Sequence, residues 1–144
     1  MKTFAILCFF ILYISQQGLG QSVIYNKDKE GRIYDFDNRF NFDVAGYFDH
    51  DLDKHYGTTL ANSIVIVKID ALGAGQLVLY VTQKTIFDIV SCHERNNEFH
   101  FILKNVRGEK VEAKITLKNE NFYAFWLYNS KDNTSLVLYY RISR

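Results

Sequence analysis

Residues 110–118 read KVEAKITLK, and their side chains alternate between apolar and charged or polar types. Successive side chains of an extended strand point to opposite faces, so the four apolar residues share one face. Strict alternation over this length is typical of a strand with one face in a core and the other in water. The stretch is therefore predicted to be a β-strand.

The preceding stretch, residues 98–104 (EFHFILK), alternates in the same way, and residues 105–108 (NVRG) between the two supply turn-forming side chains. The two stretches are predicted to form a hairpin. Similar patterns predict strands over Ser63–Ile69, Gln76–Thr82, Ile86–Ser91, Asn121–Tyr128 and Leu136–Ile142, with further candidates at Ile33–Phe36 and Phe40–Val44. The predicted fold class is all-β, an antiparallel meander of about eight strands that forms a barrel or a sandwich.

One short helix is expected in the N-terminal third of the chain. Phe48, Leu52 and Tyr56 recur at helical spacing, and Asp49 is a residue type that caps helix N-termini. The helix is predicted over Asp49–Tyr56.

The last two predicted strands are apolar on both faces. One face can pack in a core, and the other needs cover from water. A bound apolar ligand, a partner chain or the N-terminal segment of the same chain would each supply it.

The first 20 residues have the layout of a secretory signal peptide. Lys2 is followed by an apolar run over Phe4–Ile14 and by small residues at Gly18 and Gly20. The run is shorter than the roughly 18 residues that span a bilayer, and no later run is long enough. We therefore expect residues 1–20 to be a signal peptide and residues 21–144 to be a single secreted, extracellular domain.

The expected mature segment contains one cysteine, Cys92, because Cys8 lies in the predicted signal. A disulfide within the chain is then impossible. Cys92 is predicted to be a buried apolar residue, and the alternative is a homodimer bridged through it.

The predicted mature segment has 16 basic and 16 acidic residues. Nucleic acids and anionic membranes normally require a concentrated positive field, so neither is an expected partner.

No motif for nucleophilic catalysis, phosphate binding or a zinc site occurs in the sequence. We expect a protein that is not an enzyme and needs no cofactor. The weak metal candidates are Asp49, Asp51, Asp53 and His55, but Lys54 occupies the glycine position of a calcium loop. A solvated charged face explains them better, so no metal is predicted.

Asn133 begins the tripeptide Asn133-Thr134-Ser135, an acceptor sequence for N-glycosylation in a predicted loop. It is a candidate glycosylation site, which would make the chain a glycoprotein.

Two segments resemble lipocalin-like (calycin) proteins. Residues 120–144 hold an aromatic strand, a hairpin and a final strand with Arg141 and Arg144 near its end. Residues 43–48 are similar to the opening Gly-x-Trp segment of that family, with Phe48 in place of the tryptophan. The resemblance covers about a quarter of the chain, and it implies an eight-stranded barrel that holds a small apolar molecule.

Two functions follow as hypotheses. The first is a secreted binding protein whose barrel carries a small hydrophobic ligand. The alternative is a secreted effector of a salivary, venom or immune type that grips an extracellular protein or receptor through an exposed aromatic face. The candidate ligand-binding residues are Phe99, Phe101, Trp126, Tyr128, Tyr140 and Arg141.

Overall fold

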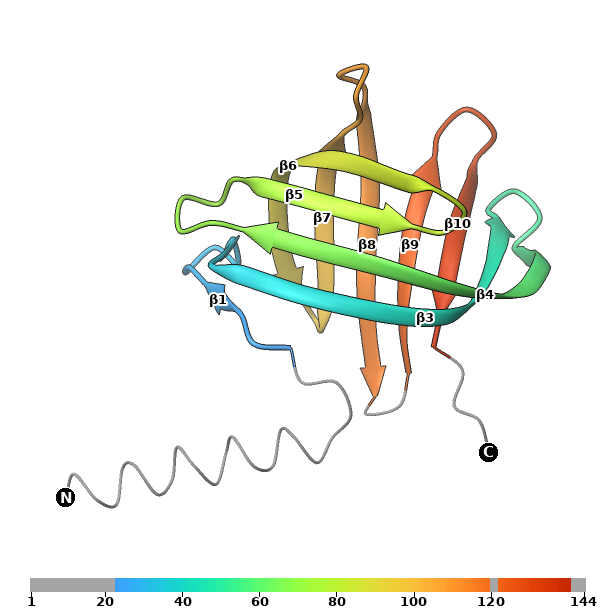
Figure 1. The fold of residues 1–144 in the computed structure, drawn as a ribbon, viewed down its shortest axis with the longest axis horizontal. Helices are drawn as coiled ribbons and strands as arrows, with labels where there is room; N and C mark the ends of the chain where they lie inside the picture. Colours follow the sequence, from blue (N-terminus) through green and yellow to red (C-terminus); the bar gives the residue numbers. More distant parts are fainter. Residues whose placement is uncertain (1–22, 120–121, 141–144) are drawn as a thin grey trace.

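The protein is an eight-stranded antiparallel barrel in the computed structural model, which describes residues 23–119 and 122–140 (Figure 1). The barrel closes in the order β10-β3-β4-β5-β6-β7-β8-β9, because β10 pairs with both β3 and β9. The strands are β1 (Asn26–Lys27), β2 (Ile33–Tyr34), β3 (Phe36–Asp49), β4 (Lys54–Ile69), β5 (Gly75–Tyr80), β6 (Lys84–Arg95), β7 (Glu98–Lys104), β8 (Lys110–Asn119), β9 (Phe122–Asn129) and β10 (Thr134–Tyr139).

The all-β prediction is confirmed, and the architecture is a barrel and not a sandwich. The predicted hairpin is β7–β8, in which Phe101 lies opposite Ala113. Both side chains are buried, as the alternating pattern requires. Residues 1–20, the predicted signal peptide, lie outside the described residues.

The helix predicted over Asp49–Tyr56 is wrong. The segment is the turn of the β3–β4 hairpin and the start of β4. Asp49 does cap backbone N–H groups, since its Oδ1 accepts hydrogen bonds from Asp51 and Leu52. The same local bonds begin a tight turn, which ends where Asp53 takes a φ of 50° and the chain reverses. Backbone pairing of β3 with β4 therefore outweighs the helical spacing of Phe48, Leu52 and Tyr56.

One end of the barrel interior is solidly packed, around the fully buried rings of Phe36, Phe99 and Phe125. The N-terminal segment lies against this end. The ring edge of Tyr25 contacts Phe99 at a centroid distance of 5.0 Å, and the Lys27 ammonium donates to the Glu94 carboxylate at 2.7 Å. The packed end is therefore closed to solvent by the chain itself.

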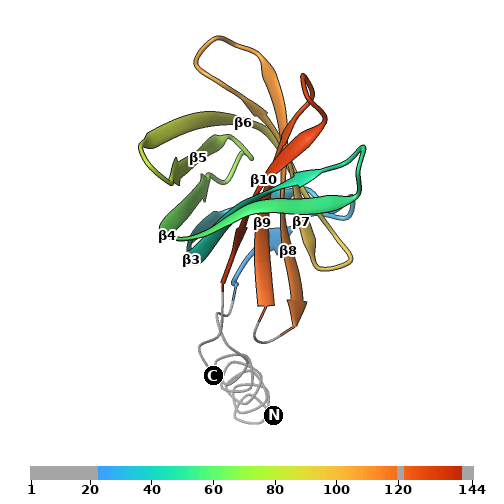
Figure 2. The same cartoon turned by 90° about the vertical axis from the view of Figure 1, so that its right-hand side faces the viewer.

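The β3–β4 hairpin does not continue the barrel wall but bends over it (Figure 2). Its strands slip in register between Phe42 and Val44 and again between Ala45 and Tyr47, and such bulges bend a hairpin. Gly57, with a φ of +64°, adds a left-handed residue to β4. As a result the hairpin tip packs on the outer face of β9 and β10, where His55 contacts Trp126 at a centroid distance of 6.0 Å.

Cys92 lies in the core with 2 % of its surface exposed. This confirms that it is a buried apolar residue. Burial raises the pKa of its thiol to about 12, because the charged thiolate loses solvation. A dimer bridged through Cys92 stays a prediction, and it would require the barrel wall to open.

Replacing Phe99 by alanine should lower the free energy of unfolding by about 3 to 5 kcal/mol, since it leaves a cavity between Phe36 and Tyr25. Urea denaturation followed by circular dichroism measures the change. The matched control is Val106→Ala in the exposed β7–β8 turn, for which we expect less than about 0.5 kcal/mol. Equal effects of the two substitutions would contradict the packed core.

Cys92 should resist a thiol reagent such as DTNB in the folded protein at pH 8, because the reactive thiolate is both rare and buried. Modification should be fast in denaturing urea, where the thiol is exposed. Equal modification rates with and without urea would show that the thiol is accessible in the native state.

Candidate functional site

The end of the barrel opposite the N-terminal segment is hollow. Val111, Leu127 and Leu136 belong to the inward-facing set of β8, β9 and β10, yet they are only partly buried. Phe125, two residues before Leu127 on β9, and Leu138, two residues after Leu136 on β10, have no exposed surface. The interior therefore changes from solid to open within one side-chain layer.

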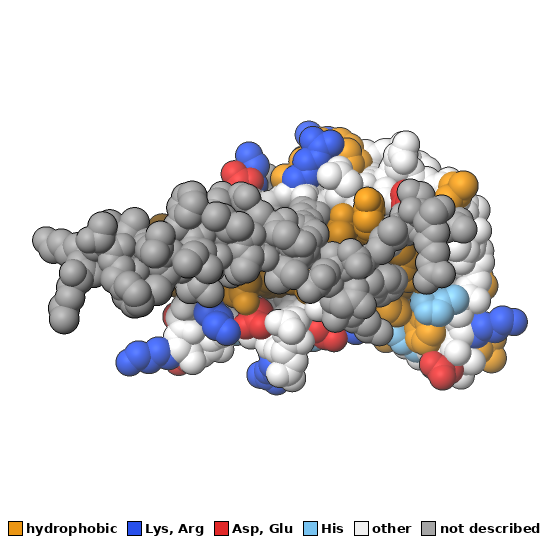
Figure 3. Space-filling model, turned by 90° about the horizontal axis from the view of Figure 1, so that it is seen from below, with side chains coloured by type: hydrophobic (Ala, Val, Ile, Leu, Met, Phe, Trp, Pro, Cys, Tyr) orange, Lys and Arg blue, Asp and Glu red, His pale blue; other side chains and the backbone are white. Residues whose placement is uncertain are grey.

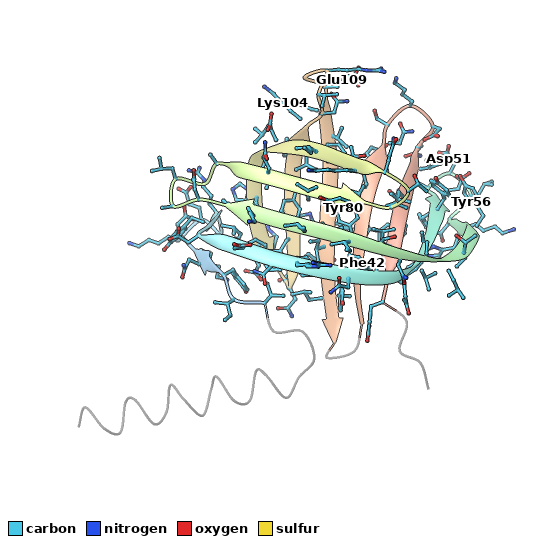
Figure 4. The ribbon with its side chains drawn as sticks, in the orientation of Figure 1. Phe42, Asp51, Tyr56, Tyr80, Lys104 and Glu109 are labelled. Atoms are coloured by element: carbon cyan, nitrogen blue, oxygen red, sulfur yellow. The ribbon has the colours of Figure 1, made fainter. Side chains whose placement is uncertain are left out.

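This barrel mouth has a volume of about 640 Å³. Its rim residues Glu109 and Tyr56 are labelled in Figure 4, on the β7–β8 turn and the β3–β4 hairpin. The lining residues are Tyr47, Tyr56, Phe87, Asn105, Glu109, Lys110, Val111, Leu127, Tyr128, Asn129, Ser130, Lys131, Asp132, Thr134 and Leu136.

The chemistry of the mouth changes with depth. The floor is apolar and is formed by Phe87, Val111, Leu127 and Leu136. The rim carries charged groups of both signs, such as Lys110 and Asp132. The rings of Tyr47 and Tyr56 stack at 5.8 Å on one side of the rim. A cavity of this size and polarity fits a small molecule with an apolar body and a polar end.

A second hollow lies outside the barrel, beside the bent hairpin. Aromatic side chains of the hairpin pack edge-on against those of the outer wall: Phe48 against Trp126 at 5.6 Å, and His50 against Tyr128 at 5.5 Å. We call Phe48, His50, His55, Trp126, Tyr128 and Tyr139 the outer aromatic cluster. Seen from below, histidine side chains lie beside hydrophobic ones at the right-hand end of the molecule (Figure 3).

Hydrogen bonds fix the two histidines of this cluster. His50 Nε2 and Ser135 Oγ are 2.8 Å apart, and His55 Nδ1 and the Tyr139 hydroxyl are 2.6 Å apart. Burial raises the pKa of Tyr139, so this hydroxyl stays protonated at neutral pH. The cluster is thus held rigidly in place.

The His50–Ser135 pair has the spacing of a base and a nucleophile, and sequence reasoning missed it. Ser135 is 2 % exposed, and among the described residues no carboxylate bonds to the other ring nitrogen of His50. Catalytic pairs of this kind normally have such an orienting group. The hydrogen bond serves to anchor the hairpin tip on β10.

An outer groove of about 580 Å³ runs along the edge of the cluster, over β7, β8 and β9. It is lined by Phe48, His50, His100, Phe101, Ile102, Glu112, Ala113, Lys114, Trp126, Tyr128 and Ser135.

The structure separates the residues that the sequence proposed as one binding site. Phe99 and Phe101 lie in the packed core, with at most 1 % exposed. Phe101 also lines the outer groove, together with Trp126 and Tyr128, and Tyr128 lines the barrel mouth as well. The ring of Tyr140 stacks on that of Tyr123 at 5.5 Å, away from both hollows. Arg141 and Arg144 lie outside the described residues.

The four weak metal candidates are not gathered into a site. The Asp49 carboxylate binds backbone N–H groups, Asp51 accepts a hydrogen bond from Asn133 Nδ2 at 2.7 Å, and His55 contacts Tyr139. Among the residues that the structure describes, no three metal-ligating side chains come together.

Asn133 lies in the β9–β10 turn with a φ of 53°. Besides the bond to Asp51, its Oδ1 accepts a hydrogen bond from the Tyr128 hydroxyl at 2.9 Å. Its amide therefore joins this turn to the β3–β4 hairpin. Glycosylation there stays a prediction.

Of the residues that line the barrel mouth, sequence reasoning named Tyr128 and missed the others. Alternation correctly placed Val111 on the apolar face of its strand, but no local signal says which end of a barrel is filled. Within residues 23–119 and 122–140, no helix is long and apolar enough to cross a membrane. Comparisons of the chain with protein-family models, with curated proteins and with solved structures find no match.

Proposed function

We propose that this chain is an extracellular, non-enzymatic binding protein that carries a small hydrophobic ligand with a polar end in the barrel mouth. The observation that carries the proposal is the abrupt change from filled to hollow inside the barrel. Inward-facing Leu127 and Leu136 are left partly exposed where Phe125 and Leu138 are covered completely. A ligand in the mouth would remove this apolar surface from water, which is favourable.

The ligand position follows from the packing. Phe99, Phe101 and Phe125 fill the other end, so the ligand enters only as far as the layer of Phe87 and Val111. Its apolar part contacts this floor. Its polar end lies at the rim, where Glu109, Lys110 and Asp132 offer charges of either sign.

The eight-stranded antiparallel barrel is compatible with the lipocalin-like resemblance of the sequence. Membership of that family is part of the proposal, and two details depart from it. Phe48, which stands where the family has tryptophan, packs on the outer wall against Trp126. The mature segment also has only one cysteine.

Binding without catalysis is proposed because neither hollow assembles the groups that a reaction needs. The mouth combines aliphatic and aromatic side chains with rim charges of opposite sign. The His50–Ser135 pair is buried and lacks an orienting carboxylate among the described residues. No cofactor is part of the proposal.

Titration calorimetry with 1-decanol tests the mouth directly. Leu136→Phe should weaken decanol binding by about tenfold or more, because the larger ring fills the space that the alkyl chain needs. The residue is only partly buried, so the fold should tolerate the substitution. Fluorescence of Trp126 is unsuitable as the readout, because the indole lies on the outer wall.

The matched control is Val90→Phe, which adds an aromatic ring at an exposed position of β6. It should leave decanol affinity within about twofold. Absence of wild-type binding up to about 0.1 mM decanol, or equal loss in both variants, would contradict a ligand site in the mouth.

A second candidate function, the secreted effector that binds an extracellular protein, is favoured by the β3–β4 hairpin. Leu52 and Leu60 are 71 % and 77 % exposed on this hairpin, which also carries the half-exposed Tyr47 and Tyr56. Apolar side chains gathered on one surface mark interaction sites. Stoichiometric recovery of a partner from extracellular fluid by the wild type, but not by Leu60→Asp, would support this function over ligand transport.

A further inference from the structure

The outer groove has a floor built from two rows of cross-strand neighbours on the outer face of the barrel. In one row Lys114 of β8 lies between His100 of β7 and Trp126 of β9. In the next row Glu112 lies between Ile102 and Tyr128. Side chains that are paired in this way contact one another across the sheet.

Lys114 is the charged group placed over the aromatic part of this floor. Its ammonium lies 5.0 Å from the ring centroid of Trp126, within the range of a cation–π interaction. Among the described residues no carboxylate forms an ion pair with it. The neighbouring His100 already pairs with Glu98 at 3.1 Å, so that carboxylate is engaged elsewhere.

The bent hairpin supplies an aromatic wall above the floor. Phe48 meets both Trp126 at 5.6 Å and His50 at 4.9 Å in edge-to-face contacts. His50 is held by Ser135, so the wall keeps its position without a ligand. The open groove between floor and wall has a volume of about 580 Å³, which is large enough for one or two aromatic rings.

We propose that the outer groove binds a small aromatic anion, with its ring between Phe48, Trp126 and Tyr128 and its negative group on the Lys114 ammonium. The ring gains apolar burial and edge-to-face contacts with side chains that are already fixed. The anion gains a charge-assisted hydrogen bond from a cation whose stem is half-buried. Glu112, at the other row, repels the anion and sets its orientation toward Lys114.

The site is independent of the ligand proposed for the barrel mouth. It lies on the opposite side of the wall, and Tyr128 is the residue whose atoms line both hollows. Trp126 is the single tryptophan of the chain, and it lines this groove but not the mouth. The two proposals can therefore fail separately.

The test uses three probes with the same ring and different charges, namely 3-phenylpropanoate, 3-phenylpropanamide and 3-phenylpropylamine, each titrated against Trp126 fluorescence. The propanoate should bind at least about fivefold more tightly than the amide. Lys114→Gln should remove this preference, whereas Lys114→Arg should retain it. Lys104→Gln, on the neighbouring strand β7 and outside the lining of both hollows, should have no effect.

Three results would overturn the proposal. The first is equal affinity for the propanoate and the amide in the wild type. The second is tightest binding of the amine, which would assign the groove to cations through Glu112. The third is an unchanged preference for the anion in Lys114→Gln. A variant that loses its native circular dichroism spectrum is replaced by Lys114→Met, so that the comparison still rests on folded protein.

Discussion

Closure of the sheet by β10 is the constraint on which the rest of the structure depends. The backbone of this strand pairs with β3 on one side and β9 on the other, so that Val137 lies between Gly46 and Trp126. A closed barrel has no unpaired edge, and each side chain must point either into it or out of it. Eight strands enclose a space that side chains nearly fill, and here phenylalanines fill one end and leave the other open.

Closure also creates the apolar outer surface that the chain then has to cover. Ala124 and Val137 point out of the barrel, yet they are 1 % and 0 % exposed. Trp126, the cross-strand neighbour of Val137, is contacted on this outer face by Phe48 and His55 of the bent β3–β4 hairpin. Of the three kinds of cover that the sequence left open, the N-terminal third of the chain supplies this part. The outer groove is the space that remains between the hairpin and β8.

The errors in the sequence-based prediction have a physical origin. Asp49 caps the same backbone groups in a helix as in the hairpin turn that it starts, so the local signal alone cannot separate the two. The decision lies in the pairing of Tyr47 with Tyr56 across the hairpin, which is a contact between segments on either side of the turn. The next strand was predicted to begin at Ser63, whereas β4 begins at Lys54. This error has the same origin, since the first residues of β4 are strand only through their pairing with β3.

The sequence by itself determined the all-β class, most of the strands and, from period-two alternation as in residues 110–118, which side chains share a face. It also predicted a mature segment that has no internal disulfide and depends on its aromatic core. Only the tertiary structure decided that Phe125 faces inward and Trp126 outward, since both faces of β9 are apolar and alternation is then uninformative. It alone decided which end of the barrel is hollow, because that depends on side chains from six strands meeting in one layer.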